Sequence, residues 1–187
     1  MVEQPDPRDD RLESLFEDLE QQAAALELEE RDAELVDRVQ GEYAGVTLAD
    51  RIHASVGRAV RLTLHGGEVL EGVLTRAGAD WTEGTSEGSA EPVGWLVRFD
   101  GVCGAAGLSP RALPEAVRPV VARLGFSSAL RRFAEAAGEV RLLPAGGPDL
   151  SGRVVRVGAD FVEVDQRSAA GPLVVPFSAL RAVRQAW

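Results

Sequence analysis

Apolar and polar residues alternate along two stretches of the chain, and the second stretch repeats the first. Residues 60–81 read VRLTLHGGEVLEGVLTRAGADW, and residues 140–161 read VRLLPAGGPDLSGRVVRVGADF. The two copies align without a gap. An alternation with a period of two residues, bounded by glycines, is typical of short antiparallel strands. The pattern therefore predicts the same group of strands twice in one chain.

Glycines recur at matching places in both copies. Each copy has a Gly-Gly pair, beginning at Gly66 and at Gly146. Such a pair predicts a tight hairpin turn, because glycine adopts positive φ at little cost. A single glycine follows in each copy, Gly72 in the first and Gly152 in the second. It lies inside a predicted strand, where glycine marks a bend or a close approach of another backbone.

The repeat extends beyond these strands in both directions. Upstream, residues 47–57 match residues 128–138, and each segment begins with a Thr or Ser and ends with a glycine, as short helices do. Downstream, residues 95–99 match residues 173–177. Each unit is therefore one short helix followed by about five short strands, and a curled sheet of that size forms a small closed or half-closed barrel.

These units resemble the Sm-like small β-barrel, which is also described as SH3-like. The resemblance rests on the helix-then-strand opening, on the pattern V-x-L-x-x-x-G-G-x-x-L-x-G, and on the closing run VPFSALRAV at residues 175–183. That run looks like the second Sm motif of the bacterial Sm-like RNA chaperones. Their RNA-contacting Tyr-Lys-His triplet is here Pro176-Phe177-Ser178, so those contacts do not carry over. The whole chain is also similar to conserved actinobacterial proteins, a likeness that implies no activity.

Charge separates an N-terminal arm from the rest of the 187-residue chain. The arm, residues 1–46, holds 15 Asp and Glu against 4 Arg, a net charge of −11, whereas residues 47–187 hold 15 against 16, a net charge of +1. We expect an α+β, mainly β protein in four parts. They are the acidic helical arm (1–46), a first Sm-like barrel with its leading helix (47–108), a helical connector (109–127) and a second such barrel (128–187).

The arm carries candidate partner-binding residues. Leu12, Leu15, Phe16 and Leu19 form an apolar stripe at helical spacing in a helix expected to end near Gly41. This stripe has three possible uses: packing on the protein's own barrels, self-association, or filling the groove of a partner protein.

No combination of residues indicates catalysis, and we expect no cofactor. Two histidines, His53 and His65, have no counterpart in the other copy, and no Cys or His pair has metal-ligand spacing. The repeated Asp80 and Asp160 follow a glycine turn, where we expect the carboxylate to bond a backbone N–H. The single cysteine, Cys103, lies among small and apolar residues, and we expect it to be buried or half-buried.

Nucleic-acid binding is the alternative function. Residues 128–187 hold eight arginines against six acidic residues. The candidate arginines for a nucleic-acid stripe are Arg131, Arg132, Arg141, Arg153 and Arg156. In this hypothesis the acidic arm folds over the stripe and masks it. One exposed stripe of arginines favours nucleic acid, and arginines scattered among ion pairs favour a protein-interaction module.

The sequence therefore predicts a non-catalytic protein-interaction or scaffold protein whose partner is another protein or a second copy. The Sm-like RNA- or DNA-binding regulator remains the alternative. The chain has neither a run of about 18 apolar residues nor an apolar signal region at its N-terminus. We expect a soluble, cytoplasmic protein.

Overall fold

The computed structural model describes residues 41, 43–86, 92–167 and 171–186, which form a mainly β protein with two α-helices in its sheet-bearing part. The chain divides into two compact units, Met1–Val46 and Thr47–Trp187, and the second unit contains the whole sheet. The predicted arm helix, with Leu12, Leu15, Phe16 and Leu19, lies outside the described residues. Among the helices described, none is long and apolar enough to span a membrane.

The repeat predicted from the sequence is visible as two similar successions of elements. The first half consists of α2 (Leu48–His53), β1 (Ala59–Leu64), β2 (Val69–Ala77), β3 (Trp81–Ser86), β4 (Val93–Arg98) and β5 (Val102–Ala106). The second half consists of α3 (Phe126–Ala137), β6 (Val140–Pro144), β7 (Leu150–Val157), β8 (Phe161–Asp165), β9 (Leu173–Pro176) and β10 (Leu180–Gln185). A 3₁₀ turn precedes the last strand of each half, at Phe99–Gly101 and Phe177–Ala179.

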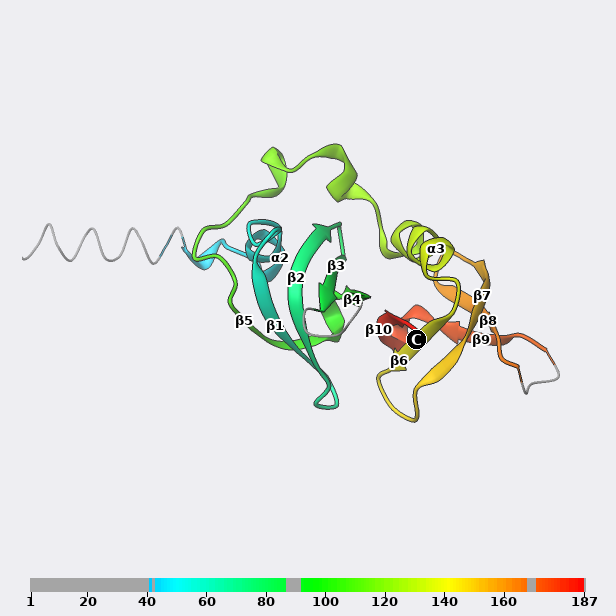
Figure 1. Cartoon of the computed structure of the whole chain (residues 1–187). Coiled ribbons are helices and arrows are strands. Elements are labelled where there is room, and N and C mark those ends of the chain that lie inside the picture. Colours follow the sequence, from blue (N-terminus) through cyan, green and yellow to red (C-terminus); the bar gives the residue numbers. More distant parts are fainter. Residues whose placement is uncertain (1–40, 42, 87–91, 168–170, 187) are drawn as a thin grey trace, which may run out of the picture. The chain divides into compact units, whose positions relative to one another are not determined.

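The ten strands form one antiparallel sheet, in the order β5-β1-β2-β3-β4-β10-β6-β7-β8-β9 (Figure 1). Each half contributes five neighbouring strands in the same relative order. The two halves join where β4 pairs with β10, through Val97 opposite Ala182, Leu96 opposite Val183 and Trp95 opposite Arg184. The structure thus has one continuous sheet rather than two separate closed barrels.

The strands at the junction are buried on both faces. Trp95 and Val97 of β4 belong to a core cluster with Ile52, whereas Leu96 between them belongs to a second cluster with Leu130. All five of these side chains have 0% relative exposure. A strand covered on both faces reads as a continuous apolar run, as β4 does in Trp95-Leu96-Val97. Each half therefore contributes residues to the other half's core.

The glycines have the roles that the sequence predicts. Gly66 and Gly67, between β1 and β2, have φ of +93° and +88°. A Cβ atom on Gly72 would lie 1.9 Å from the carbonyl oxygen of Thr85, and one on Gly152 would lie 2.3 Å from that of Asp165. No such contact is tolerated, so the close approach of β2 to β3, and of β7 to β8, requires glycine at both positions.

The connector between the halves contains two short 3₁₀ turns, Glu115–Val117 and Val120–Arg123, in place of one longer helix. Pro114 precedes the first turn and Pro119 precedes the second, both with extended ψ angles. Proline lacks a backbone N–H and disfavours helix at the residue before it, so each proline starts a new turn instead of continuing the last.

Candidate functional site

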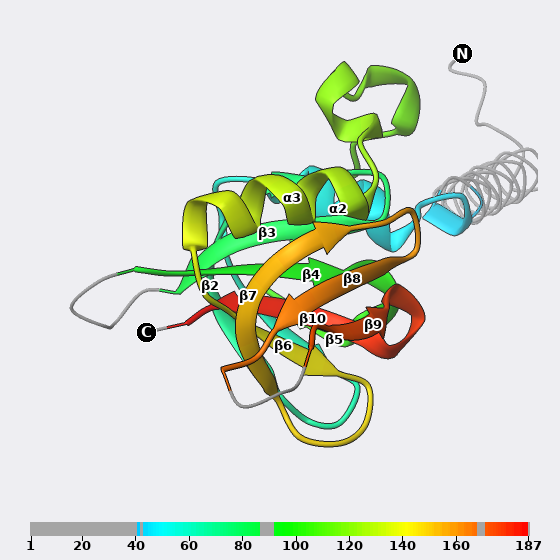
Figure 2. The same cartoon turned by 90° about the vertical axis from the view of Figure 1, so that its right-hand side faces the viewer.

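A groove of about 540 Å³ lies between helix α3 and strand β7. Figure 2 shows these two elements side by side in the second half. Arg131 reaches the groove from α3, and Arg153 and Arg156 reach it from β7. Val155 and Val157 supply apolar surface to its lining. We call this feature the arginine groove.

The helix presents Arg131 because its apolar residues occupy the opposite face. Phe126, Leu130 and Phe133 of α3 are buried in the second-half core, with at most 7% exposure. Residues three and four positions apart share a helix face, so these side chains define one buried stripe. Arg131 lies outside that stripe and is exposed.

A β-bulge brings Arg153 and Arg156 to the same side of β7. In a regular strand, residues three apart point to opposite faces. In the pairing of β7 with β8, however, the register shifts between Val154 and Arg156, leaving Val155 as an extra residue. A bulge of this kind re-aims the next side chain. The only sequence signal was the loss of alternation at Val154-Val155, and we did not predict the bulge.

The positive charge of the groove is weakly neutralised. Arg153 is exposed and forms no ion pair with a described residue. Arg156 lies 3.4 Å from Glu163, but its side chain is 74% exposed. Arg131 donates a 3.4 Å hydrogen bond to the carbonyl oxygen of Val157. Exposed pairs of this kind contribute little. The lining holds three arginines and one carboxylate, Glu135, so the groove presents a net positive charge beside apolar surface.

The other two candidate arginines lie elsewhere. Arg132 donates to Glu83 at 2.8 Å, and its guanidinium lies 5.5 Å from the centre of the Trp81 ring. Arg141, on β6, lies 3.7 Å from Asp149. The structure therefore brings together three of the five candidates in the groove. The other two form ion pairs outside it.

The remaining arginines of residues 128–186 also have partners outside the groove. Arg167 pairs with Glu139 at 2.7 Å, and Arg184 pairs with Glu68 of the first half at 3.2 Å. Arg181 donates to the carbonyl oxygen of Pro144 at 2.6 Å. These arginines tie neighbouring elements together rather than extending the arginine groove.

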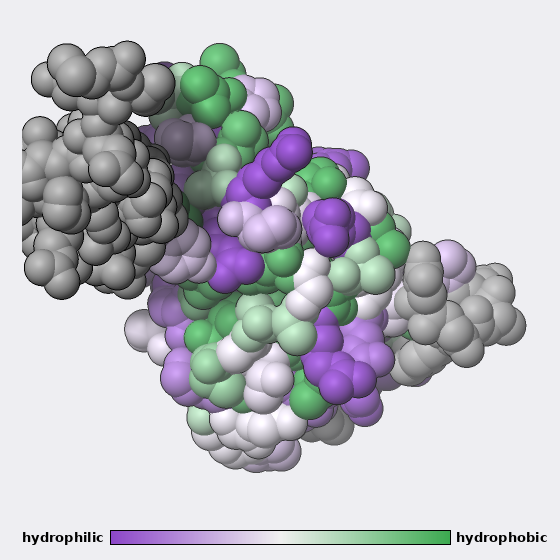
Figure 3. Space-filling model, turned by 90° about the vertical axis from the view of Figure 1, so that its left-hand side faces the viewer, coloured by the Kyte–Doolittle hydropathy of each residue, from purple (hydrophilic) through white to green (hydrophobic). Residues whose placement is uncertain are grey.

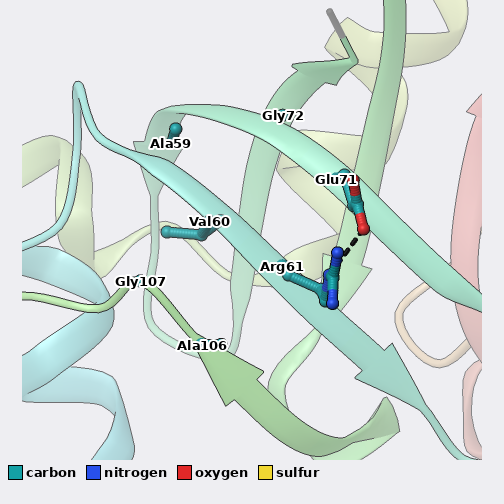
Figure 4. Close-up of a pocket in the computed structure, with 7 residues that line it drawn as sticks. All are labelled: Ala59, Val60, Arg61, Glu71, Gly72, Ala106 and Gly107. Atoms are coloured by element: carbon teal, nitrogen blue, oxygen red, sulfur yellow. Dashed lines mark ion pairs between the residues drawn. The ribbon is translucent and has the colours of Figure 1, made fainter.

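A second, shallower hollow of about 400 Å³ lies beside β1, β2 and β5 (Figure 4). Arg61 and Glu71 point toward each other across the β1–β2 pair and form an ion pair of 2.5 Å. Ala106 and Gly107, which have a small side chain or none, also line the hollow. Its charges neutralise one another, so this hollow offers no net charge to attract a ligand.

Cys103 is exposed, so the prediction that it would be buried or half-buried is wrong. The reason is its position on β5, which lies at one end of the sheet order and pairs only with β1 among the described strands. Its thiol donates to the carbonyl oxygen of Thr63 at 3.3 Å. The small and apolar residues next to Cys103 in the sequence indicated burial, but a strand at the edge of a sheet leaves such residues open to solvent.

Asp80 has the structural use that the sequence predicts. Its carboxylate accepts a 2.9 Å hydrogen bond from the backbone N–H of Phe126, the first residue of α3. An acceptor at this position satisfies one of the unpaired N–H groups of a helix start and favours the positive end of the helix dipole. The partner belongs to the other half of the chain, which the sequence did not indicate.

His53 is buried, with 7% exposure, and lies 3.0 Å from the carbonyl oxygen of Gly78 through Nε2. A carbonyl oxygen only accepts, so Nε2 carries the proton in this contact. Burial lowers the pKa of His53 below its ordinary value of 6.5. His65, by contrast, is exposed at the β1–β2 turn.

The lowered pKa of His53 predicts acid sensitivity in a defined pH range. The unfolded chain takes up a proton near pH 6.5 before the folded chain does, so the free energy of unfolding falls as the pH drops through 6.5. We expect His53→Gln to flatten this slope in urea titrations. The control His65→Gln removes an exposed imidazole instead, and equal slopes for the unaltered protein and His53→Gln would contradict the assignment.

Within the ranges that the structure covers, no three His, Cys, Asp or Glu side chains group in a way that could hold a metal ion. Comparison of the chain with protein-family models, with curated proteins and with solved structures finds no match. The arginine groove is the candidate site that the geometry of the chain itself provides.

Proposed function

We propose that the protein is a cytoplasmic, non-catalytic protein-interaction module that binds an acidic peptide segment in the arginine groove. The distribution of the arginines of the second half carries this proposal. Four of them outside the groove, at positions 132, 141, 167 and 184, pair with Asp or Glu side chains on several different elements. That scatter favours a protein surface over a nucleic-acid track.

The lining of the groove supports a peptide ligand. Valine side chains flank the arginines, and Val155 is 49% exposed. An acidic segment with apolar side chains on one face matches both features, since carboxylates pair with guanidinium groups and the apolar face covers the valines. Single-stranded nucleic acid, by contrast, normally stacks its bases on exposed aromatic rings. In the described part of Thr47–Trp187, no Phe or Trp side chain is fully exposed: Phe99 and Phe161 are partly buried, and the others, Trp81, Trp95, Phe126, Phe133 and Phe177, are buried.

The assignment of each half as an Sm-like or SH3-like unit is part of this proposal. It is supported by the helix-then-strand succession and by the identical order of five strands in each half. Folds of this size host many unrelated functions, so the assignment supports a small interaction module without naming its partner.

Charge reversal in the groove tests the proposed function. The probe is a fluorescent peptide of residues 8–39, which joins acidic residues to the Leu12–Leu19 apolar stripe. We expect Arg153→Glu in the full chain to weaken binding about tenfold, because a repulsive charge replaces an attractive one at the ligand surface. The control Arg141→Glu lies outside the groove and should bind as the unaltered protein does. Equal binding by both variants would contradict the proposal.

Nucleic-acid binding remains the second candidate, because Arg131, Arg153 and Arg156 share one groove. The test compares RNA and DNA binding by the full chain and by a version that begins at Thr47, each at two salt concentrations. Salt-dependent binding that strengthens when the acidic arm is removed would support an arm that masks the groove. Unchanged affinity at low salt would exclude that masking.

A further inference from the structure

The two end strands of the sheet, β5 and β9, repeat the two strands that join its halves. The order β5-β1-β2-β3-β4 is followed by β10-β6-β7-β8-β9, so β9 is the counterpart of β4 and β5 is the counterpart of β10. Inside the chain, β4 pairs with β10. Among the described strands, β9 pairs only with β8 and β5 only with β1. The β4–β10 type of junction therefore forms once inside the chain. At each end of the sheet, one strand of the same type has no strand paired along its outer edge among the described residues.

The junction inside the chain is fully buried, and its counterparts at the ends are not. Leu96 and Val183, opposite each other at the β4–β10 junction, are both 0% exposed. Their counterparts are Val174, which is 56% exposed, and Ala105, which is also exposed. Leu173, the counterpart of the buried Trp95, is 37% exposed. These residues are apolar, like the residues at the junction, but no described strand covers them.

The composition of β9 is that of a strand covered on both faces. Leu173-Val174-Val175 is a continuous apolar run, like Trp95-Leu96-Val97 of β4, and Val175 alone is buried. Neither β9 nor β5 contains a charged residue. Edge strands in soluble proteins normally carry charges, because unpaired backbone N–H and C=O groups attract other strands. Within β9 itself, Pro176 is the one residue of a kind that protects an edge.

The side-chain sizes of the two open edges are complementary. The register of the β4–β10 junction, transferred to the ends, sets Leu173 opposite Ala106, Val174 opposite Ala105 and Val175 opposite Gly104. The larger side chains of β9 thus meet the smallest residues of β5. Pro176 corresponds to Arg98, which lies one position beyond the three paired residues of β4. Its missing N–H therefore leaves this register intact. Figure 3 views the β5 end of the molecule, where apolar and near-neutral residues cover much of the visible surface.

We propose that β9 of one copy pairs antiparallel with β5 of a second copy, in the register of the β4–β10 junction, so that copies assemble head to tail. This goes beyond the proposed peptide binding and does not depend on it. Because the two edges differ, the contact is heterologous, and each added copy leaves one edge of each kind open until the assembly closes.

Complementary edge variants test this assembly in the full chain. Val174→Arg places a charge on the β9 edge, and Ala105→Glu places one on the β5 edge. Both residues are exposed, so both variants should fold as the unaltered protein does by circular dichroism. By light scattering after size exclusion, we expect the unaltered protein to form oligomers whose mass rises with concentration. Each variant alone should be a single chain. The control Val69→Arg, at a 44% exposed position in β2, should assemble normally.

Mixing the two variants gives the decisive result. The intact β9 of Ala105→Glu can pair with the intact β5 of Val174→Arg, so the mixture should form assemblies containing equal amounts of both. If like edges paired with like, Ala105→Glu alone would still dimerise through β9, and the proposal would be wrong. Association that persists in Val174→Arg alone and in Ala105→Glu alone would overturn it in favour of another surface, such as the acidic arm.

A designed cross-link checks the register independently. In a Cys103→Ser background, Ala105→Cys together with Val174→Cys should give disulfide-linked multimers on a non-reducing gel, since directly opposite Cβ atoms lie about 4.5–5.5 Å apart. Moving the second cysteine to Val69 should remove the multimers. Arg153→Glu should change neither assembly nor cross-linking, which separates this proposal from the peptide-binding one.

Discussion

Replacing Trp81 by alanine is expected to destabilise the protein by about 3–5 kcal/mol, the usual range for a large aromatic side chain removed from a core. Trp81 is 0% exposed and lies in the core cluster of the second half, although β3 belongs to the first half. Its indole N–H also donates to the carbonyl oxygen of Leu124 at 2.7 Å. The substitution therefore removes packing between the halves and one of the two hydrogen bonds to the Leu124 carbonyl, which keeps the bond from the Ala79 N–H.

Urea unfolding of Trp81→Ala beside two controls measures this effect. Phe161→Ala changes the counterpart residue in β8, which is only partly buried and should lose less stability. Trp81→Phe keeps a ring but removes the N–H, and we expect a loss of about 0.5–1.5 kcal/mol from the missing hydrogen bond, since the Ala79 N–H still donates to the Leu124 carbonyl. Equal losses for Trp81→Ala and Phe161→Ala would show that Trp81 does not hold the halves together.

Replacing Asp50 by alanine is the second large expected effect, also about 3–5 kcal/mol, because it leaves a buried cation without its partner. Asp50 is 8% exposed and accepts from Arg118 at 2.5 Å, and the Arg118 side chain is 9% exposed. The other carboxylate oxygen accepts from the backbone N–H and the hydroxyl of Thr47, at 2.8 and 2.6 Å. One carboxylate thus caps α2 and anchors the connector.

The matched control is the exposed ion pair of Arg61 and Glu71, whose side chains are 63% and 58% exposed. Glu71→Ala should cost less than about 1 kcal/mol, because water solvates both charges. The hydrogen bonds from Thr47 and the Arg118 guanidinium lower the pKa of Asp50 below 3.8. Its contribution to stability is therefore present above pH 3.8 and is lost as the pH falls below that value. Similar losses for Asp50→Ala and Glu71→Ala would contradict the buried-pair argument.

The repeat made much of the local structure predictable. Alternation and paired glycines predicted the strands and the turn at Gly66-Gly67, and the two helices lie near their predicted places. Thr47 caps α2 as predicted, but α3 begins at Phe126 after Gly125, so the prediction that Ser128 caps it is wrong. These features depend on neighbours along the chain, and local backbone sterics and hydrogen bonding decide them. The connector differed, because two prolines divided it into separate turns.

The candidate site was predictable only in its residue types. The sequence indicated arginines in the second half, but the β7 bulge decided that Arg153 and Arg156 would face the same groove. Ion pairs with residues distant in the chain, such as Glu83 and Glu68, decided that Arg132 and Arg184 would not. A bulge and a long-range ion pair both depend on which strands become neighbours, which is not encoded in the period of a single strand.

The sequence by itself determined a duplicated unit of one helix and five strands, an acidic arm, and the positions that require glycine. Only the tertiary structure decided that the units share one sheet, that β4 and β10 bury both faces at the junction, and that Cys103 lies at an edge. The physical reason is that an alternating pattern specifies which side chains share a face of a strand, whereas the backbone groups along its edges are alike in every sequence. Which edges pair is settled by packing between residues far apart in the chain, such as Trp81 with Leu130.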